Sequence, residues 1–339
     1  MKKAIVLVLT LIAVLILAVS CAKQGATGSG ESLLAYLPQS TNGVIVMDVG
    51  RIMNTDVASK SIKEDKAFQK YQEFVQKTGI DPQKDIHFVA IGLAGDLASK
   101  SADAAVIVNM TYKKDDLLAK IKAEAKDLQE TTYNGATLYT VPEKGDDKPA
   151  YVTFLSDTII AGGSEAAIKS VVDIQQKKAE SALKNEALAG ILKGARKDAM
   201  VWCAFSVPAE AMDKATADNP MMANLKGLYG LTMFFDYKNK SLQAEIKGLN
   251  KDEAKNKEIA TMLDGLKAMG AMASAKEPSL GEVLEKIAIA SGPDAITISV
   301  DIPEDLLNKL KAKAEEKAEG LLTKKPTTET PEGKDEIEE

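Results

Sequence analysis

The order of apolar and polar residues along the first half of the chain predicts alternating strands and helices. Short β-branched runs between turn residues are typical of strands, and apolar residues three or four positions apart are typical of helices. Asn134-Gly135 lies between two such runs and predicts a tight hairpin turn. Ser164 is the expected N-cap of the helix after it. The predicted strands are 43–49, 86–93, 104–112, 136–141, 151–155 and 158–161, and the predicted helices are 59–78, 114–128 and one beginning at 164.

The same order of elements recurs in the second half. It predicts helices at 188–192, 208–217 and 252–272, strands at 199–207, 231–237, 242–249, 287–290 and 295–302, and a last helix from Pro303. Because tight turns join successive strands, the sheets should be mainly antiparallel. We therefore predict an α+β fold of two similar units, 33–180 and 181–320, each with helices packed on one face of its sheet. A single irregular α+β domain is the alternative.

The first twenty residues have the layout of a secretory signal. Lys2 and Lys3 precede an apolar run at 4–17, and small residues stand directly before Cys21. The apolar run is short for a membrane span. Residues 1–20 are therefore predicted to be removed, 21–32 to form a flexible tether, and the acidic stretch 321–339 to be disordered. An uncleaved helix with an incidental cysteine is the alternative.

Leu17-Ala18-Val19-Ser20-Cys21 resembles the bacterial lipobox, with Ala18 where Leu is more common. The resemblance implies that the Cys21 thiol carries diacylglycerol and that acyl chains such as palmitate hold the protein to a lipid bilayer. Ala22 rather than Asp follows the cysteine. By analogy with lipoprotein sorting, this favours the outer membrane, on its periplasmic or surface face, in a bacterium with two membranes. In other bacteria we expect the outer face of the plasma membrane.

Three further stretches are similar to a group of exported bacterial proteins that have a duplicated α+β domain of unknown function. They are Leu37-Pro38 running into 44–48, Thr78-Gly79-Ile80-Asp81-Pro82, and residues 296–305. All three are motifs of the fold. The resemblance therefore implies an architecture and no activity.

Charge and cysteine content limit the classes of partner and of chemistry that the chain supports. Without residues 1–20 the chain loses Lys2 and Lys3, so 41 basic residues face 49 acidic ones, a net charge of about −8. Such a surface does not favour nucleic acid as a partner. Cys203 is the one cysteine after Cys21 and lies in an apolar strand, which predicts a buried, unreactive thiol.

Residues with catalytic or metal-binding chemistry are sparse. His87 is the single histidine, so zinc or copper sites built from His and Cys are excluded by count, and we expect it exposed at a strand end. Gly162-Gly163-Ser164 favours a plain strand-to-helix turn over an anion site. The carboxylate pairs lack the spacing of a calcium loop and are typical of helix starts; they are Asp115-Asp116, Asp146-Asp147 and Asp252-Glu253. We predict no catalytic residue, no cofactor, no metal and no enzymatic activity.

Methionine is concentrated in the second half, at 200, 212, 221, 222, 233, 262, 269 and 272. Flexible Met side chains fill cores or line adaptable apolar surfaces. We expect 262 and 269 on the inward stripe of the 252–272 helix, and we name Met221, Met222, Leu225 and Leu228 as possible apolar contacts. Aromatic residues make up 5% of the chain, which does not favour a sugar-stacking surface.

Two functional hypotheses remain. The first is a membrane-anchored envelope lipoprotein that acts as a non-enzymatic protein-binding or scaffold module, with an unidentified envelope protein as its partner. The alternative is a carrier or chaperone for an apolar ligand held in the Met-rich second half. A carrier needs an apolar cavity, whereas a binding module needs an exposed apolar patch.

Overall fold

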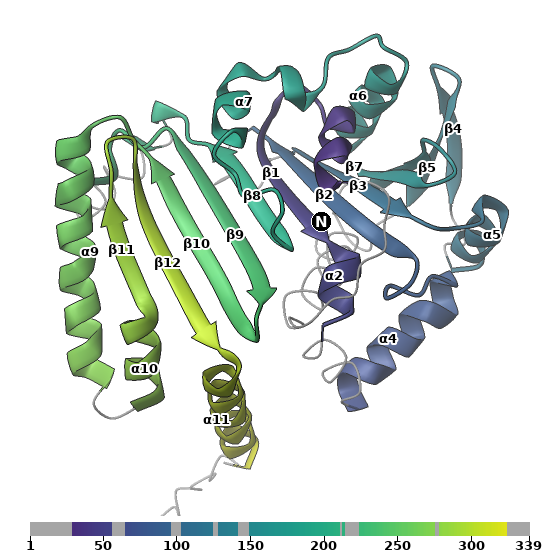
Figure 1. The fold of residues 1–339 in the computed structure, drawn as a ribbon. Helices are drawn as coiled ribbons and strands as arrows, with labels where there is room; N and C mark the ends of the chain where they lie inside the picture. Colours follow the sequence, from purple (N-terminus) through teal and green to yellow (C-terminus); the bar gives the residue numbers. More distant parts are fainter. Residues whose placement is uncertain are drawn as a thin grey trace, which may run out of the picture.

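The computed structural model describes residues 29–55, 65–95, 103–124, 128–141, 149–210, 212–213, 224–274 and 278–323. Its strands pair antiparallel throughout and form one large sheet (Figure 1). The predicted α+β class and the antiparallel pairing are confirmed. The strands are β1 (Thr41–Asp48), β2 (Ile86–Ala94), β3 (Asp103–Met110), β4 (Gln129–Tyr133), β5 (Ala136–Val141), β6 (Ala150–Phe154), β7 (Ile159–Gly163), β8 (Val201–Ser206), β9 (Gly230–Lys238), β10 (Ser241–Leu249), β11 (Ile287–Ser291) and β12 (Ala295–Pro303).

Helices connect these strands at both faces and ends of the sheet. They are the 3-10 helices η1 (Gly30–Tyr36) and η2 (Ala182–Lys184), and the α-helices α2 (Val49–Met53), α4 (Asp65–Thr78), α5 (Lys114–Glu124), α6 (Glu165–Gln175), α7 (Glu186–Leu192), α9 (Glu253–Ala273), α10 (Pro278–Lys286) and α11 (Glu304–Thr323). Within the described ranges, none of these helices combines the length and the apolar content that a membrane span requires.

The two halves of the chain share the sheet and meet where β1 pairs with β8, with Ile45 opposite Cys203. From that pair outward the order is β2, β3, β7, β6 on one side and β9, β10, β12, β11 on the other, with β5 and β4 added beyond β6. On each side two consecutive strands follow the central one, and the last hairpin returns in reverse. An internal duplication would produce this order, and the duplication itself stays a prediction.

One face of the sheet is apolar from β11 to β3. Successive residues of a strand point to opposite faces, so paired residues form rows across the sheet. A single row through the centre of the sheet contains only apolar side chains, in the order Ile289, Ile298, Ile246, Met233, Cys203, Ile45, Ile91 and Val106.

In the first half, helices cover both faces of the sheet, whereas the sequence predicted helices on one face. On the opposite face from the central row, η1 and α6 of the first half, together with α7 of the second, bury Val44 and Ile107 with Trp202 of β8. On the face of the central row, α2 and α5 close a second core around Val89. The reason is that β1, β2 and β3 are apolar at nearly every position, so neither face can be left in water.

In the second half, the two faces differ. The face opposite the central row carries Gln243, Glu245 and Lys247 on β10, which alternate with Ala244 and Ile246. Helix α9 contacts β11 and β12, and the loop before β9 contacts both β10 and α9. There Leu228 lies over Gly248, and Asn224 contacts the Met262 sulfur at 3.7 Å.

Local sequence signals account for most element ends. Asn134 and Gly135 both adopt positive φ, as a two-residue hairpin requires, and Ser164 accepts a hydrogen bond from the Ala167 amide as N-cap of α6. Helix α10 was not predicted, although Pro278 at its first position is a typical helix start. The predicted boundaries of the tether and of the tail also differ from the structure. Residues 30–32, expected in the tether, belong to η1, and α11 extends to Thr323.

Candidate functional site

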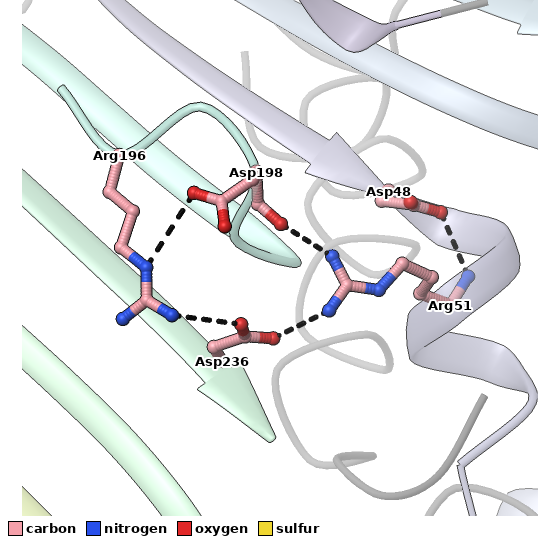
Figure 2. Close-up of polar contacts among 5 residues, drawn as sticks. All are labelled: Asp48, Arg51, Arg196, Asp198 and Asp236. Carbon is pink, nitrogen blue, oxygen red and sulfur yellow. Dashed lines mark hydrogen bonds and ion pairs between the residues drawn. The ribbon is translucent and has the colours of Figure 1, made fainter. Parts of the chain in front are cut away.

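The strongest polar constellation lies where the two halves meet (Figure 2). Arg51 on α2 donates through Nη2 to Asp236 Oδ1 on β9 at 2.8 Å, and through Nη1 to the backbone carbonyl of Asp198 at 2.7 Å. Arg196 contributes a second cation, with Nη2 3.5 Å from Asp236 Oδ2 and its guanidinium 4.3 Å above the Phe234 ring. We call Asp48, Arg51, Arg196, Asp198 and Asp236 the seam cluster.

Burial and geometry suit the seam cluster to a structural role. The Asp236 side chain is 3% exposed and lies between two guanidiniums. Asp48 caps α2 by accepting the Arg51 amide at 2.8 Å, and its own amide donates to the Met200 carbonyl. Burial raises the pKa of Asp48 above its ordinary value, against the lowering effect of Arg51. The cluster therefore ties the β1–α2 corner of the first half to β9 of the second, with both guanidiniums engaged.

A second feature is a set of large apolar side chains that reach solvent in the second half. Met269 and Met272 on α9 are 66% and 80% exposed, and Leu266 on the same helix is 41% exposed. Phe235 on β9 and Ile246 on β10, both on the apolar sheet face, are 41% and 42% exposed. With Leu280 of α10, these residues make up what we call the open apolar surface. A contiguous patch of exposed apolar side chains is a candidate interaction site.

The predicted apolar contacts coincide with this surface only in part. Met221 and Met222 lie outside the described residues. Leu225 is half-buried, and Leu228 is buried over Gly248, so Leu228 is a packing residue and not an exposed contact. Met269, expected on the inward stripe of its helix, is exposed instead. The stripe does not follow one face of the helix, because Ile259 is buried while later members turn away from the sheet.

Two hollows lie in the first half, with volumes of about 70 and 310 Å³. The smaller is lined by Pro38, Gly92 and Ser170, and the larger by Tyr36 and Phe88 among others. Neither hollow is in the Met-rich half, where the carrier hypothesis placed its ligand.

The remaining candidates occupy structural positions. Cys203 is 5% exposed, and burial raises the pKa of its thiol to about 12, so the predicted buried thiol is confirmed. His87 lies at the start of β2, as predicted, but it is half-buried and not exposed, with Nε2 2.9 Å from the Thr111 hydroxyl. Gly163 is needed for packing, because a Cβ there would lie 2.2 Å from the Ala104 carbonyl oxygen. Cys21 lies outside the described residues.

Two of the three carboxylate pairs lie at helix starts. Asp252 is the N-cap of α9 and accepts the Lys255 amide at 3.1 Å, and Asp115 and Asp116 occupy the first turn of α5. Asp146 and Asp147 lie outside the described residues. Among the residues that are described, no group of three or more potential metal ligands comes together.

Comparison with known proteins found solved structures with a similar fold and no related sequence. No family model and no curated protein matches the sequence. Among solved structures, the chain is similar to TP0453 in its crystal forms III, I and IV, with TM-scores of 0.45, 0.45 and 0.44. The identities are 10%, 10% and 9%, and the matches cover 86%, 85% and 84% of this chain and 100%, 98% and 97% of TP0453. A likeness at this level says nothing about function.

Proposed function

We propose that this protein is an envelope lipoprotein, held to a membrane through acylated Cys21, that binds another protein through the open apolar surface. The observation that carries the proposal is the exposure of Met269 and Met272, at 66% and 80%. Leaving such side chains in water forgoes the free energy of burying them, so their exposure is best explained by a partner that covers them. We propose that the protein has no enzymatic role.

The position and the chemistry of the surface support a protein partner. Helix α9 lies at the β11 end of the sheet, whereas the tether joins η1 over β1, β2 and β3 (Figure 1). Between β1 and β11 the sheet contains β8, β9, β10 and β12. At the usual spacing of strands, α9 is therefore on the order of 20 Å from the strands under η1. Met side chains are flexible and adapt to an irregular protein surface.

The anchor is tested by replacing the lipidated cysteine. Cys21→Ser removes the thiol that would carry the lipid, so the variant should remain uncleaved or unlipidated. We expect the wild-type protein in the detergent phase after phase separation with Triton X-114, without the mass of the signal peptide. A Cys21→Ser variant that is processed and partitions like wild type would contradict the anchor.

The binding surface is tested by crosslinking in intact cells. A photo-reactive amino acid at position 269 should give a discrete protein adduct, and a second Met272→Glu substitution should abolish it. The same amino acid at Phe68 is a matched control, because Phe68 is a 46% exposed apolar residue on α4 of the first half. Equal adducts at 269 and 68, or adducts at 269 with lipid alone, would contradict a protein-binding surface there.

A further inference from the structure

The larger hollow of the first half has an unusual lining. It has a volume of about 310 Å³, at the lower end of the ~300–1,000 Å³ typical of small-molecule sites. Although 27% of the chain is charged, none of the ten residues that line this hollow is charged. The lining instead offers hydroxyl groups from Ser32, Ser156 and Thr158, an amide from Asn109, and the rings of Tyr36 and Phe88.

The walls of this hollow come from separate elements that are fixed to one another. Thr158 is in the turn between β6 and β7, where its carbonyl accepts the Met110 amide at 2.9 Å and the Asn109 side-chain amide at 3.4 Å. The Ser156 carbonyl in the same turn accepts the Tyr112 hydroxyl. On the opposite side, Gly30 of η1 packs on Phe88, since a Cβ at Gly30 would lie 3.2 Å from that ring. These bonds fix the backbone of the turn at Ser156 and Thr158 and hold the Asn109 amide against it, so the wall of the hollow is formed before any ligand arrives.

The lining decides the class of ligand. The hollow is open to water where Ser32, Ser156 and Thr158 line it, and no lining residue offers an opposite charge, so neither an anion nor a cation is favoured there. A purely apolar ligand would displace water from the exposed hydroxyl groups of Ser32, Ser156 and Thr158 without replacing its hydrogen bonds. A sugar ring has hydroxyl groups at its edge and C–H groups on its face, so it can hydrogen-bond to Asn109, Ser156 and Thr158 and contact Tyr36 or Phe88.

We propose that this hollow is a binding site for an uncharged sugar unit of an envelope glycan. The low aromatic content of the chain did not favour such a site, but two aromatic residues are among the ten that line it. Ser29 also lines the hollow and lies eight residues after Cys21, a span of at most about 28 Å. The place of the site near a bilayer rests on the proposed anchor, whereas the ligand chemistry does not.

The test is saturation-transfer difference NMR on the lipidated mature protein in phosphatidylcholine vesicles, which contain no sugar. Chitotriose and maltotriose are the uncharged probes, and galacturonate is the charged one. We expect saturable transfer to at least one uncharged probe and none to galacturonate. Asn109→Leu should weaken binding tenfold or more, and Asn308→Leu, the same change at an exposed site on α11, should leave it unchanged.

A second variant guards against misfolding of the first. Thr158→Val keeps the shape of an exposed side chain and removes only its hydroxyl, so it should fold normally and weaken sugar binding severalfold. Absence of saturable transfer to both uncharged probes would overturn the proposal, as would binding that survives both variants. Neither result would affect crosslinking from position 269, so this test fails or succeeds separately from the proposed protein-binding function.

Discussion

The two halves of the sheet share one strand-pairing scheme and bury their side chains differently. In the first half, helices on both sides bury β1, β2 and β3 on both faces. In the second half, β10 has a polar face with Glu245 and Lys247, and its apolar face leaves Ile246 42% exposed. The comparison teaches that strand order alone does not decide which side chains reach solvent; the cover of each face does, and incomplete cover leaves apolar side chains exposed in the second half.

The largest effect should come from removing a residue of the doubly covered region. Trp202 is on β8, the second-half strand that pairs with β1, and is buried in the same core as Val44. It is 1% exposed, so Trp202→Ala should lower the free energy of unfolding by about 3–5 kcal/mol. Phe235→Ala on the open face should cost roughly 1 kcal/mol, because that ring already contacts water. Urea unfolding of both variants checks the contrast. Equal losses would mean that the two faces are equally buried.

The seam cluster should rank second. Arg51→Ala leaves the buried Asp236 carboxylate with Arg196 alone at 3.5 Å, which should cost about 2 kcal/mol, less than for a fully buried pair because Arg51 is 31% exposed. Lys77→Ala on α4 breaks an exposed ion pair with Glu73 and should cost less than about 0.5 kcal/mol. The two variants are compared by chemical denaturation. A seam variant as stable as the α4 variant would show that the halves do not depend on this contact.

Glycine substitutions probe packing on the two sides. Gly163→Ala in β7 would force a methyl group against the Ala104 backbone and should cost about 1–3 kcal/mol. Gly265→Ala in α9 meets open space in a helix interior and should stabilise by up to about 1 kcal/mol. Thermal unfolding measures both. A neutral Gly163→Ala would contradict the close packing of β7 against β3.

The smallest effect concerns pH. Because the folded state raises the pKa of Asp48 above its unfolded value, ionised Asp48 destabilises the fold at neutral pH. Wild type should therefore gain stability relative to Asp48→Asn as the pH falls from about 7 to 4, since Asn keeps the N-cap but does not titrate. Urea midpoints of the two proteins across this range provide the measurement. A difference that stays constant or reverses with pH would contradict the raised pKa.

Local patterns predicted the individual elements well, and long-range contacts account for what they missed. The turn at Asn134-Gly135 needs only its own backbone, so two residues suffice to predict it. Local patterns do not predict contacts between distant segments. Ile45 pairs with Cys203, and Arg51 contacts Asp236, which is 185 residues away. The sequence therefore predicted two units but not their union in one sheet.

The sequence predicted the candidate surface only through its methionine content. Methionine content pointed to the second half, but the named contacts Leu225 and Leu228 are half-buried and buried, respectively. Exposure of Met269 depends on where α9 leaves the sheet, which helical periodicity does not determine. Trp202 and Phe235 show the same limit, since both lie in apolar strands and only the cover of each face separates them.

Methionine oxidation tests the central claim most directly, because the chain carries its own probes. Mild peroxide should oxidise Met269 and Met272 in the purified protein well before Met53 and Met200, which are 1% and 2% exposed. Peptide mass spectrometry reads each site. In the intact envelope, we predict that Met269 and Met272 become protected by the bound partner while Met53 and Met200 are unchanged. Equal oxidation of Met269 and Met272 in the envelope and in purified protein would contradict a partner on the open apolar surface.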